Sequence, residues 1–336
     1  MINVTVFYKE ENEVLNSILV DLEEIKNKLE FEITKIDILS ESSLYERYKN
    51  SVPVIVVGPY QIKTPANRQD MEITIQAAID RQKKLLENDA NYKKRLELNN
   101  TVTASDRFTV WISKTYIYFI CAIIIIYSGL PFMAPVFMKN RMELPANIIY
   151  SVYSTVCHQL AYRSFFLFGE QYYYPRQLAN IPAQITFETA TGIDPTNIQD
   201  SKNFIGNDKL GYKVAFCERD TAIYASILLF GIIFIISKRK IKGIPWYVWI
   251  IIGMIPMGLD GGIQLFSYIK MVLPIWVPLY ESSPLMRVIT GGLFGFSMAW
   301  YIFPIIEESM LDSRSSVVSK MAVIKAKNES RLKNAV

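Results

Sequence analysis

The only histidine of the chain lies in the triplet Cys157-His158-Gln159, directly after a cysteine. A second polar cluster, Cys217-Glu218-Arg219-Asp220, contains another of the three cysteines. Thiol and imidazole groups ligate metal ions and support redox chemistry near neutral pH. Both clusters adjoin strongly apolar segments, so the sequence predicts a polar site at the edge of a membrane.

Two thiols, an imidazole and a carboxylate suit zinc in type and number. The predicted ligands are Cys157, His158, Cys217 and Asp220. Neighbouring residues of a helix point about 100° apart, so either Cys157 or His158 is expected to support a ligand rather than be one. A disulfide between Cys157 and Cys217 is the alternative, and an oxidising outer face would favour it.

Charged side chains within apolar runs complete the predicted site, because such groups are costly in a bilayer and mark function or a paired network. Asp260 lies in the outer half of one run, and Arg287 lies one turn into another. An ion pair of Asp260 with Arg287 or Arg219 is the structural alternative to a catalytic role. The further polar residues of the site are Gln159, Arg163, Arg219, Asp260 and Arg287.

Four apolar runs approach the roughly 20 residues that a membrane-spanning helix needs. They cover residues 109–130, 222–236, 246–269 and 285–306. Lysine-rich and arginine-rich segments at 83–95, at 238–242 and in the tail should all face the cytosol, which four spans allow and five do not. Residues 150–159 are therefore interpreted as a short interfacial or re-entrant helix, and 163–169 as an extended stretch folding back toward Cys217.

The domain organisation follows from this pattern. An α/β domain at 1–82 and a charged connector at 83–107 precede a transmembrane domain at 108–306. Residues 170–216 form an outer-face insertion, and 307–336 form a basic cytosolic tail. Acidic and basic residues near the start of the chain exclude a signal peptide. We expect a multi-pass protein of the cell membrane with both termini in the cytoplasm.

The N-terminal domain has a β-α-β-α-β-β-α pattern, with an alternating run at 2–8 and a buried strand at 52–58. This order resembles the thioredoxin and glutaredoxin fold, and Val52-Pro53 matches the position of that fold's cis proline. Redox-active members carry Cys-x-x-Cys after the first strand, whereas residues 8–13 here contain no thiol. Disulfide exchange needs a thiolate, so we expect a redox-inactive domain that binds a cytosolic protein partner.

The transmembrane motifs resemble a prokaryotic family of predicted membrane proteins of unknown function. The motifs that carry the resemblance are Cys157-His158-Gln159, 163–169, Cys217-x-Arg219, Leu259-Asp260-Gly261-Gly262 and Arg287-x-x-Thr290-Gly291. The family pattern is Cys-His-Gln followed by Cys-x-Arg-Cys-Thr-Gly-Ile-Tyr. Asp220 and Ala222 replace a cysteine and a glycine of that pattern, so neither a Cys-x-x-Cys dithiol nor a three-thiolate metal site can form. The resemblance implies an architecture and candidate residues, but no reaction.

Composition and the absence of two known motifs exclude further classes of function. A net charge of +4, without a basic stripe of interleaved aromatics, argues against nucleic acid as a partner. No phosphate-binding glycine loop or serine nucleophile elbow is present. The sequence predicts a protein in contact with the lipid bilayer that carries an outer-face site, either metal-binding, with zinc as cofactor, or disulfide-bonded. The alternative is a non-enzymatic membrane anchor whose N-terminal domain binds a partner, and the sequence leaves open whether the protein is an enzyme.

Overall fold

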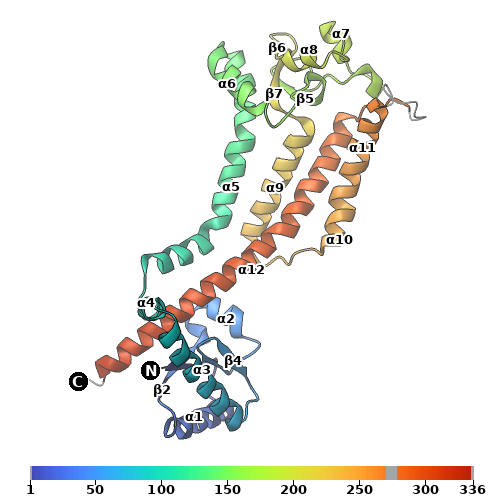
Figure 1. Cartoon of the computed structure of the whole chain (residues 1–336). Helices are drawn as coiled ribbons and strands as arrows, with labels where there is room; N and C mark the ends of the chain where they lie inside the picture. The colour runs from blue at the N-terminus through green and yellow to red at the C-terminus, as the bar shows by residue number, and fades with distance from the viewer. Residues whose placement is uncertain (1, 270–277, 334–336) are drawn as a thin grey trace. The chain divides into compact units, whose positions relative to one another are not determined.

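The structure, a computed structural model, describes residues 2–269 and 278–333 of the chain. Its contacts separate two units: a head unit made of Met1–Thr115 with Glu308–Val336, and a span unit made of Tyr116–Glu307. Two long helices, α5 (Ala104–Lys139) and α12 (Pro284–Lys333), supply residues to both units (Figure 1).

The head unit is built on a mixed four-stranded sheet with the order β2-β1-β3-β4. Strand β1 is parallel to β2 and antiparallel to β3, which pairs with β4 in an antiparallel hairpin. The strands are β1 (Ile2–Tyr8), β2 (Phe31–Asp37), β3 (Val54–Val57) and β4 (Tyr60–Lys63). The helices are α1 (Glu13–Lys26), α2 (Ser42–Tyr48), α3 (Arg68–Asn88) and α4 (Tyr92–Asn99). The predicted order of strands and helices is found.

Local sequence explains where α1 begins and which face it buries. The Asn12 side chain accepts a hydrogen bond from the backbone N–H of Leu15 at 2.9 Å, which caps the first turn. The apolar residues Leu15, Ile18, Leu22 and Ile25 recur at helical spacing and are all buried. They pack against residues of β1 and β3 in the main core of the head unit.

The segment after Glu307 is helical rather than a simple polar tail. It continues α12, and Val318 packs with Phe7 and Leu44 in a second core of the head unit. Arg47 donates a hydrogen bond to the Ser315 hydroxyl at 2.7 Å, and Lys320 pairs with Asp106 at 2.7 Å. The few apolar residues of this segment lie at helical spacing, which explains how a mostly polar stretch still packs as a helix.

Within the described residues, four helices are long and apolar enough to cross a membrane, as the sequence predicted. These stretches are Ala104–Lys139, Glu218–Ile236, Trp246–Ser267 and Pro284–Glu329. The third comprises α10 (Trp246–Trp249), a π-helical turn at Ile250–Met254 and α11 (Ile255–Ile269). Helices α9 (Glu218–Ile236) and α12 approach each other closely at Gly295 of α12. A Cβ atom added to Gly295 would lie only 2.3 Å from the Ile223 carbonyl oxygen.

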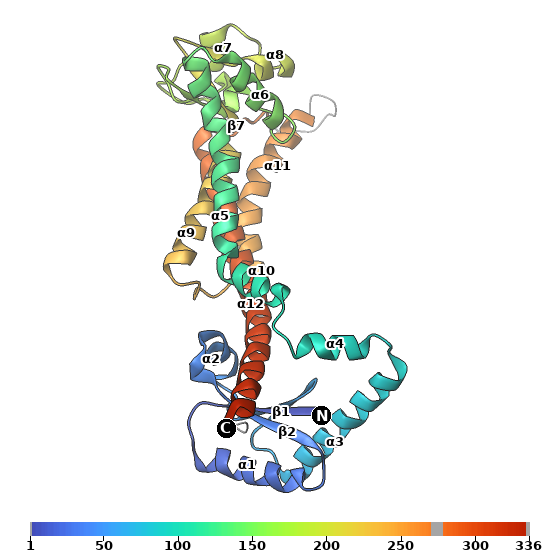
Figure 2. The same ribbon diagram turned by 90° about the vertical axis from the view of Figure 1, so that its left-hand side faces the viewer.

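Residues 143–217, which we call the cap, gather at one end of the four long helices (Figure 2). The cap contains α6 (Glu143–Tyr153), α7 (Phe187–Thr191), α8 (Ile198–Asn203), β5 (Ser164–Leu167), β6 (Gly206–Asn207) and β7 (Gly211–Cys217). The strands form an antiparallel sheet in the order β5-β7-β6. Ser164 pairs with Cys217, so the predicted extended stretch does fold back onto that cysteine.

The short helix predicted at 150–159 is displaced, since α6 already ends at Tyr153. The hydroxyls of Ser154 and Thr155 bond to nearby backbone carbonyls, and Gln159 adopts a left-handed backbone with φ 51°. Hydroxyl side chains that bond to local backbone compete with helix continuation. Cys157 and His158 therefore lie in a loop and not on a helix.

Candidate functional site

Cys217 and Asp220 come together because strand β7 passes directly into helix α9. Cys217 is the residue before the first turn of α9, and its Sγ accepts a hydrogen bond from the backbone N–H of Asp220 at 3.3 Å. The start of a helix carries partial positive charge and unpaired N–H groups. The Cys217 thiol and the Asp220 carboxylate therefore lie together at a helix end that attracts negative charge.

Cys157 reaches the same point from the loop after α6. Its side chain is buried, and the ligand atoms of Cys157, Cys217 and Asp220 all lie within 4.8 Å of one another. Tyr153 and Phe216, which precede the two cysteines by a few residues, pack edge to face with 5.0 Å between ring centroids. This aromatic contact holds the loop and the strand end together.

The sulfur atoms of Cys157 and Cys217 are not bonded to each other and lie close enough to interact. A hydrogen bond with Cys157 raises the pKa of Cys217 well above its ordinary value, and burial and the neighbouring Asp220 act in the same direction. Without a cation the Cys217 thiol is therefore held in its protonated form at neutral pH.

His158 does not belong to this cluster, although it follows Cys157 directly. Its side chain is exposed, whereas those of Cys157 and Gln159 are buried. Successive residues of an extended loop point to opposite sides, so one of two neighbours faces outward. That only one of Cys157 and His158 contacts an ion directly stays a prediction. The reason given for it was wrong, because the two residues lie in a loop and not on a helix.

A pocket of about 240 Å³ lies beside the Cys157, Cys217 and Asp220 cluster. All the predicted site residues except Asp260 line it. Its lining residues are Val156, Cys157, His158, Gln159, Leu160, Arg163, Cys217, Arg219, Asp220, Gln264 and Arg287. The loop after α6, the start of α9, the C-terminal part of α11 and the first turn of α12 therefore meet at one place.

Asp260 lies just behind the pocket and binds Arg219, one of the two partners that the sequence left open. The Arg219 guanidinium donates to its carboxylate at 2.5 Å. The hydroxyls of Tyr280 and Ser282 also donate to Asp260, at 3.1 and 2.8 Å. Asp260 is thus a buried acceptor with a partner on α9 and two in the segment before α12.

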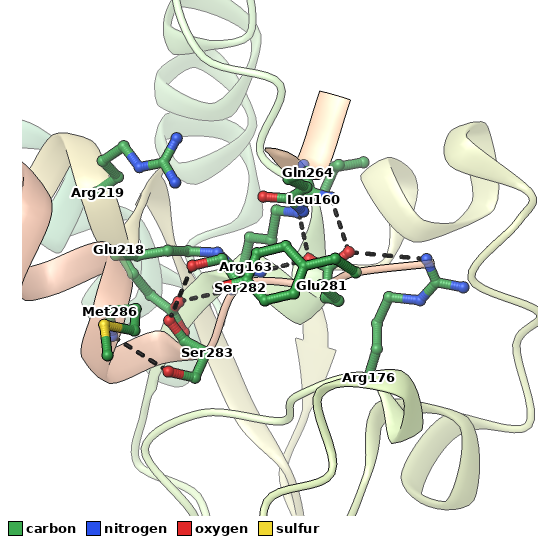
Figure 3. A network of polar contacts seen from close by, with 12 residues as sticks. Leu160, Arg163, Arg176, Glu218, Arg219, Gln264, Glu281, Ser282, Ser283 and Met286 are labelled. Atoms are coloured by element: carbon green, nitrogen blue, oxygen red, sulfur yellow. Dashed lines mark hydrogen bonds and ion pairs between the residues drawn. The ribbon is translucent and has the colours of Figure 1, made fainter. Parts of the chain in front are cut away.

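Arg287 belongs to a separate ion network that the sequence did not predict. It donates to Glu218 at 2.9 Å and also to Glu281, whose carboxylate binds Arg163 through two hydrogen bonds of 2.8 and 3.0 Å. Figure 3 shows Arg176 approaching the same Glu281 carboxylate from the other side, at 3.8 Å. Alternating charges of this kind offset the high cost of burying each ion alone.

Sequence reasoning missed Glu218, Glu281 and Arg176, although each is polar and adjoins a predicted span or the insertion. Glu218 lies inside the Cys217–Asp220 cluster, and its position directly before an apolar run was a usable signal. Arg176 lies in the insertion, in which no ligand cluster was expected. It contributes through a contact with a distant loop that no local pattern reveals.

Lys213 of β7 supports the backbone of the Cys157 loop. Its Nζ donates to the carbonyl of Gln159 at 2.9 Å and to the carbonyl of Lys202, while its own carbonyl accepts from the Tyr150 hydroxyl. The side chain is 1% exposed, and burial lowers the pKa of Lys213 to about 7. A neutral amine has two N–H donors, which matches the two carbonyls that it meets.

Comparisons with known proteins agree with a membrane protein. Residues 201–301 match the model of a family described as "Predicted membrane protein (DUF2085)". The chain is also 29% identical over 201 residues to an uncharacterized protein of Methanocaldococcus jannaschii, MJ1492, in an alignment covering 58% of this chain and 94% of that protein. The family match includes Cys217, Arg219, Asp260 and Arg287, and it begins after Cys157. With the four apolar helices, these similarities support a membrane protein in contact with the lipid bilayer.

Proposed function

We propose that this membrane protein binds a zinc ion through Cys157, Cys217 and Asp220 at the end of its spans where α9 and α12 begin. The observation that carries the proposal is the approach of two thiols and one carboxylate to within 4.8 Å of one another. Two thiolates on one tetrahedral zinc lie about 3.8 Å apart, given Zn–S bonds of about 2.3 Å. Small side-chain rotations would therefore bring the three groups to ligand distance.

Three protein ligands leave one tetrahedral position for another group. Zinc sites of this kind hold water or substrate in the fourth position, whereas structural sites have four protein ligands. The pocket lies next to the three ligands, so we assign the fourth position to a molecule in the pocket. We assign His158 to the wall of the pocket and not to the metal.

Charge supports the same assignment. Two thiolates and a carboxylate around Zn²⁺ leave one net negative charge. The guanidinium of Arg219 lines the pocket beside them, so a positive group is near that charge. Zinc would also replace the protons that the neighbouring thiols now share, because only the thiolate is a ligand.

The test is the metal content of the purified full chain in a mild detergent. We expect about one zinc per chain in the wild type and a loss of most of it in Cys217→Ser or Cys157→Ser. Cys121→Ser is the matched control, because Cys121 is a buried thiol of α5 that does not belong to the cluster and should leave the zinc content unchanged. A wild-type protein without stoichiometric metal would refute the proposal.

A disulfide between Cys157 and Cys217 is a second candidate, and the short separation of their sulfur atoms favours it. Thiol labelling of the unfolded chain, with and without reductant, separates the two candidates. A bridge leaves Cys121 labelled and protects the other two until reductant is added. Labelling of all three cysteines without reductant rules the bridge out.

For the head unit we propose a thioredoxin-like fold that has no redox activity and binds a protein. The parallel β1–β2 pair beside the antiparallel β3–β4 hairpin supports the fold, and the absence of cysteine from residues 8–13 supports the loss of redox chemistry. We place both termini in the cytoplasm and the cap on the outer face, because residues 238–242 are rich in lysine and arginine. Reporter tags at His158 and Lys240 should be accessible from opposite sides of the membrane.

A further inference from the structure

The pocket beside the proposed zinc site contains buried N–H donors that have no partner among the described residues. They are Gln264 Nε2 on α11 and Arg219 Nε on α9. Gln264 is only 6% exposed, although it lines the pocket, and the other end of the Arg219 guanidinium is bound to Asp260. Buried donors are almost always paired, so these two indicate a missing acceptor.

The surrounding charges indicate which kind of acceptor fits. Guanidinium groups of Arg163, Arg219 and Arg287 line the same pocket. Arginine and amide N–H groups recognise oxyanions well, because several donors can reach different oxygen atoms of one ligand. The two unpartnered donors come from α9 and α11, and Arg163, which is bound to Glu281, adds positive charge from the loop after α6, so donors and charge approach from different directions. This arrangement suits the tetrahedral oxygens of a phosphate group better than a planar carboxylate.

The position of Gln264 suggests how such a group could be carried. Its neighbours on α11, Ile263, Leu265 and Phe266, are 46%, 61% and 58% exposed, and in a membrane protein such apolar surface faces lipid. The polar donor therefore lines the pocket, whereas its three apolar neighbours on α11 are exposed to lipid. A phosphate could enter either dissolved in water or attached to a lipid.

We infer that this pocket binds a phosphate group, with Gln264 and Arg219 as donors and the open position of the metal next to one phosphate oxygen. The inference rests on the proposed zinc site, because a metal ion is needed to neutralise Asp220 and the two thiolates beside the anion. About 240 Å³ is room for far more than one water molecule, whose share of liquid volume is about 30 Å³.

The test uses the full chain in a phosphate-free maltoside detergent, with cobalt(II) in place of zinc. Thiolate-to-cobalt absorption reports the metal site itself, and a change in the cobalt d–d bands reports a ligand in the open position. One arm adds inorganic phosphate and the other adds dihexanoyl phosphatidic acid. Binding in either arm supports the inference, and binding of the lipid alone identifies the membrane as the source. The inference is overturned when neither compound changes the cobalt bands and dialysis detects no binding of radiolabelled phosphate.

Gln264→Leu removes the donor while keeping the apolar surroundings. We expect the cobalt bands to remain and the affinity for phosphate to fall about tenfold or more. Gln199→Leu, on the exposed face of α8, is the matched control and should bind as the wild type does. If Gln264→Leu does not fold, Gln264→Glu keeps the size and polarity of the side chain and should bind more weakly still. Variants with intact cobalt bands and wild-type affinity overturn the inference.

The outcome also separates this inference from the zinc proposal. A wild-type protein without the thiolate-to-cobalt band refutes the metal site, and dialysis of that metal-free protein against radiolabelled phosphate then tests the donors alone. A protein with the band but without phosphate binding keeps the metal site and loses the phosphate.

Discussion

Arg287 and Glu218 form an ion pair of 2.9 Å, with side chains that are 3% and 0% exposed. The two residues lie in the first turns of α12 and α9, so the pair joins the starts of two long helices. Glu281 links this pair to Arg163, and Arg163 lines the pocket. The polar site and the packing of the helices are therefore parts of one network.

Removing the cation of this pair should be strongly destabilising. Arg287→Met leaves two buried carboxylates, Glu218 and Glu281, without their shared partner, and the expected loss is about 3–5 kcal/mol in the free energy of unfolding. Thermal unfolding in detergent measures it, with Met286→Leu, an exposed neighbour, as the control. The double variant Arg287→Met with Glu218→Gln should recover part of the loss. A single variant as stable as the wild type would show that the pair has no structural role.

Replacing Asp260 by asparagine should have a smaller effect. The hydroxyls of Tyr280 and Ser282 donate to different oxygens of Asp260, so Asp260→Asn keeps an acceptor for one of them, and it removes the charge that holds Arg219. We expect a loss of about 1–2 kcal/mol, since Arg219 is partly exposed and water compensates for some of the lost contact. The quantity to measure is the loss of unfolding free energy in Asp260→Asn, divided by the loss in Arg287→Met. A larger loss than for Arg287→Met would contradict this ranking of the two ion pairs.

Lys213 predicts a specific pH dependence of stability. Burial lowers its pKa to about 7 in the folded chain from 10.5, so between these values the unfolded chain binds a proton that the folded chain has released. The free energy of unfolding should therefore rise as the pH increases from about 7 toward 10, by up to about 1.4 kcal/mol per pH unit. Chemical unfolding at several pH values measures this slope.

Two substitutions separate the contribution of Lys213 from that of other groups. Lys213→Met should flatten the slope above pH 7, because no amine remains to titrate. Lys209→Met, at an exposed lysine of the same region, should keep it. Equal slopes in the wild type and in Lys213→Met would assign the pH dependence to another residue.

The close approach of α9 and α12 can be tested with a pair of glycines. Gly295→Ala places a Cβ 2.3 Å from the Ile223 carbonyl oxygen, so the helices must separate and we expect a loss of about 1–3 kcal/mol. Gly292→Ala, on the same helix, has no atom within 4 Å of the new Cβ and should be neutral or slightly stabilising. Thermal unfolding of the two variants gives the comparison. Equal stability would show that the helices do not pack at Gly295.

The sequence predicted which side chains lie together at the site, but it did not predict which of them form ion pairs. Cys157, Cys217, Asp220 and Arg219 stood out because thiols and charges beside apolar runs are unusual, and the structure places them around one pocket. The partner of Asp260 stayed open, because the rotation of each helix about its axis depends on contacts such as that at Gly295. The spacing of residues within one segment does not predict such contacts between segments.

Loops were harder to predict than spans for a related reason. A hydropathy pattern locates a span because about 20 residues contribute to one signal, whereas the inward direction of Glu281 depends on a single residue. The early end of α6 had a local signal in Ser154 and Thr155, whose hydroxyls bond to the backbone. The prediction of a helix at 150–159 depended on the charge bias of the flanking segments and did not use this signal.

The continuity of α12 has a consequence for biosynthesis. The head unit includes strands that precede the four spans in the chain, but Val318 in its second core is translated after most of the fourth span. That core stays incomplete while the hydrophobic helices are being inserted, and it closes only when the end of α12 leaves the ribosome.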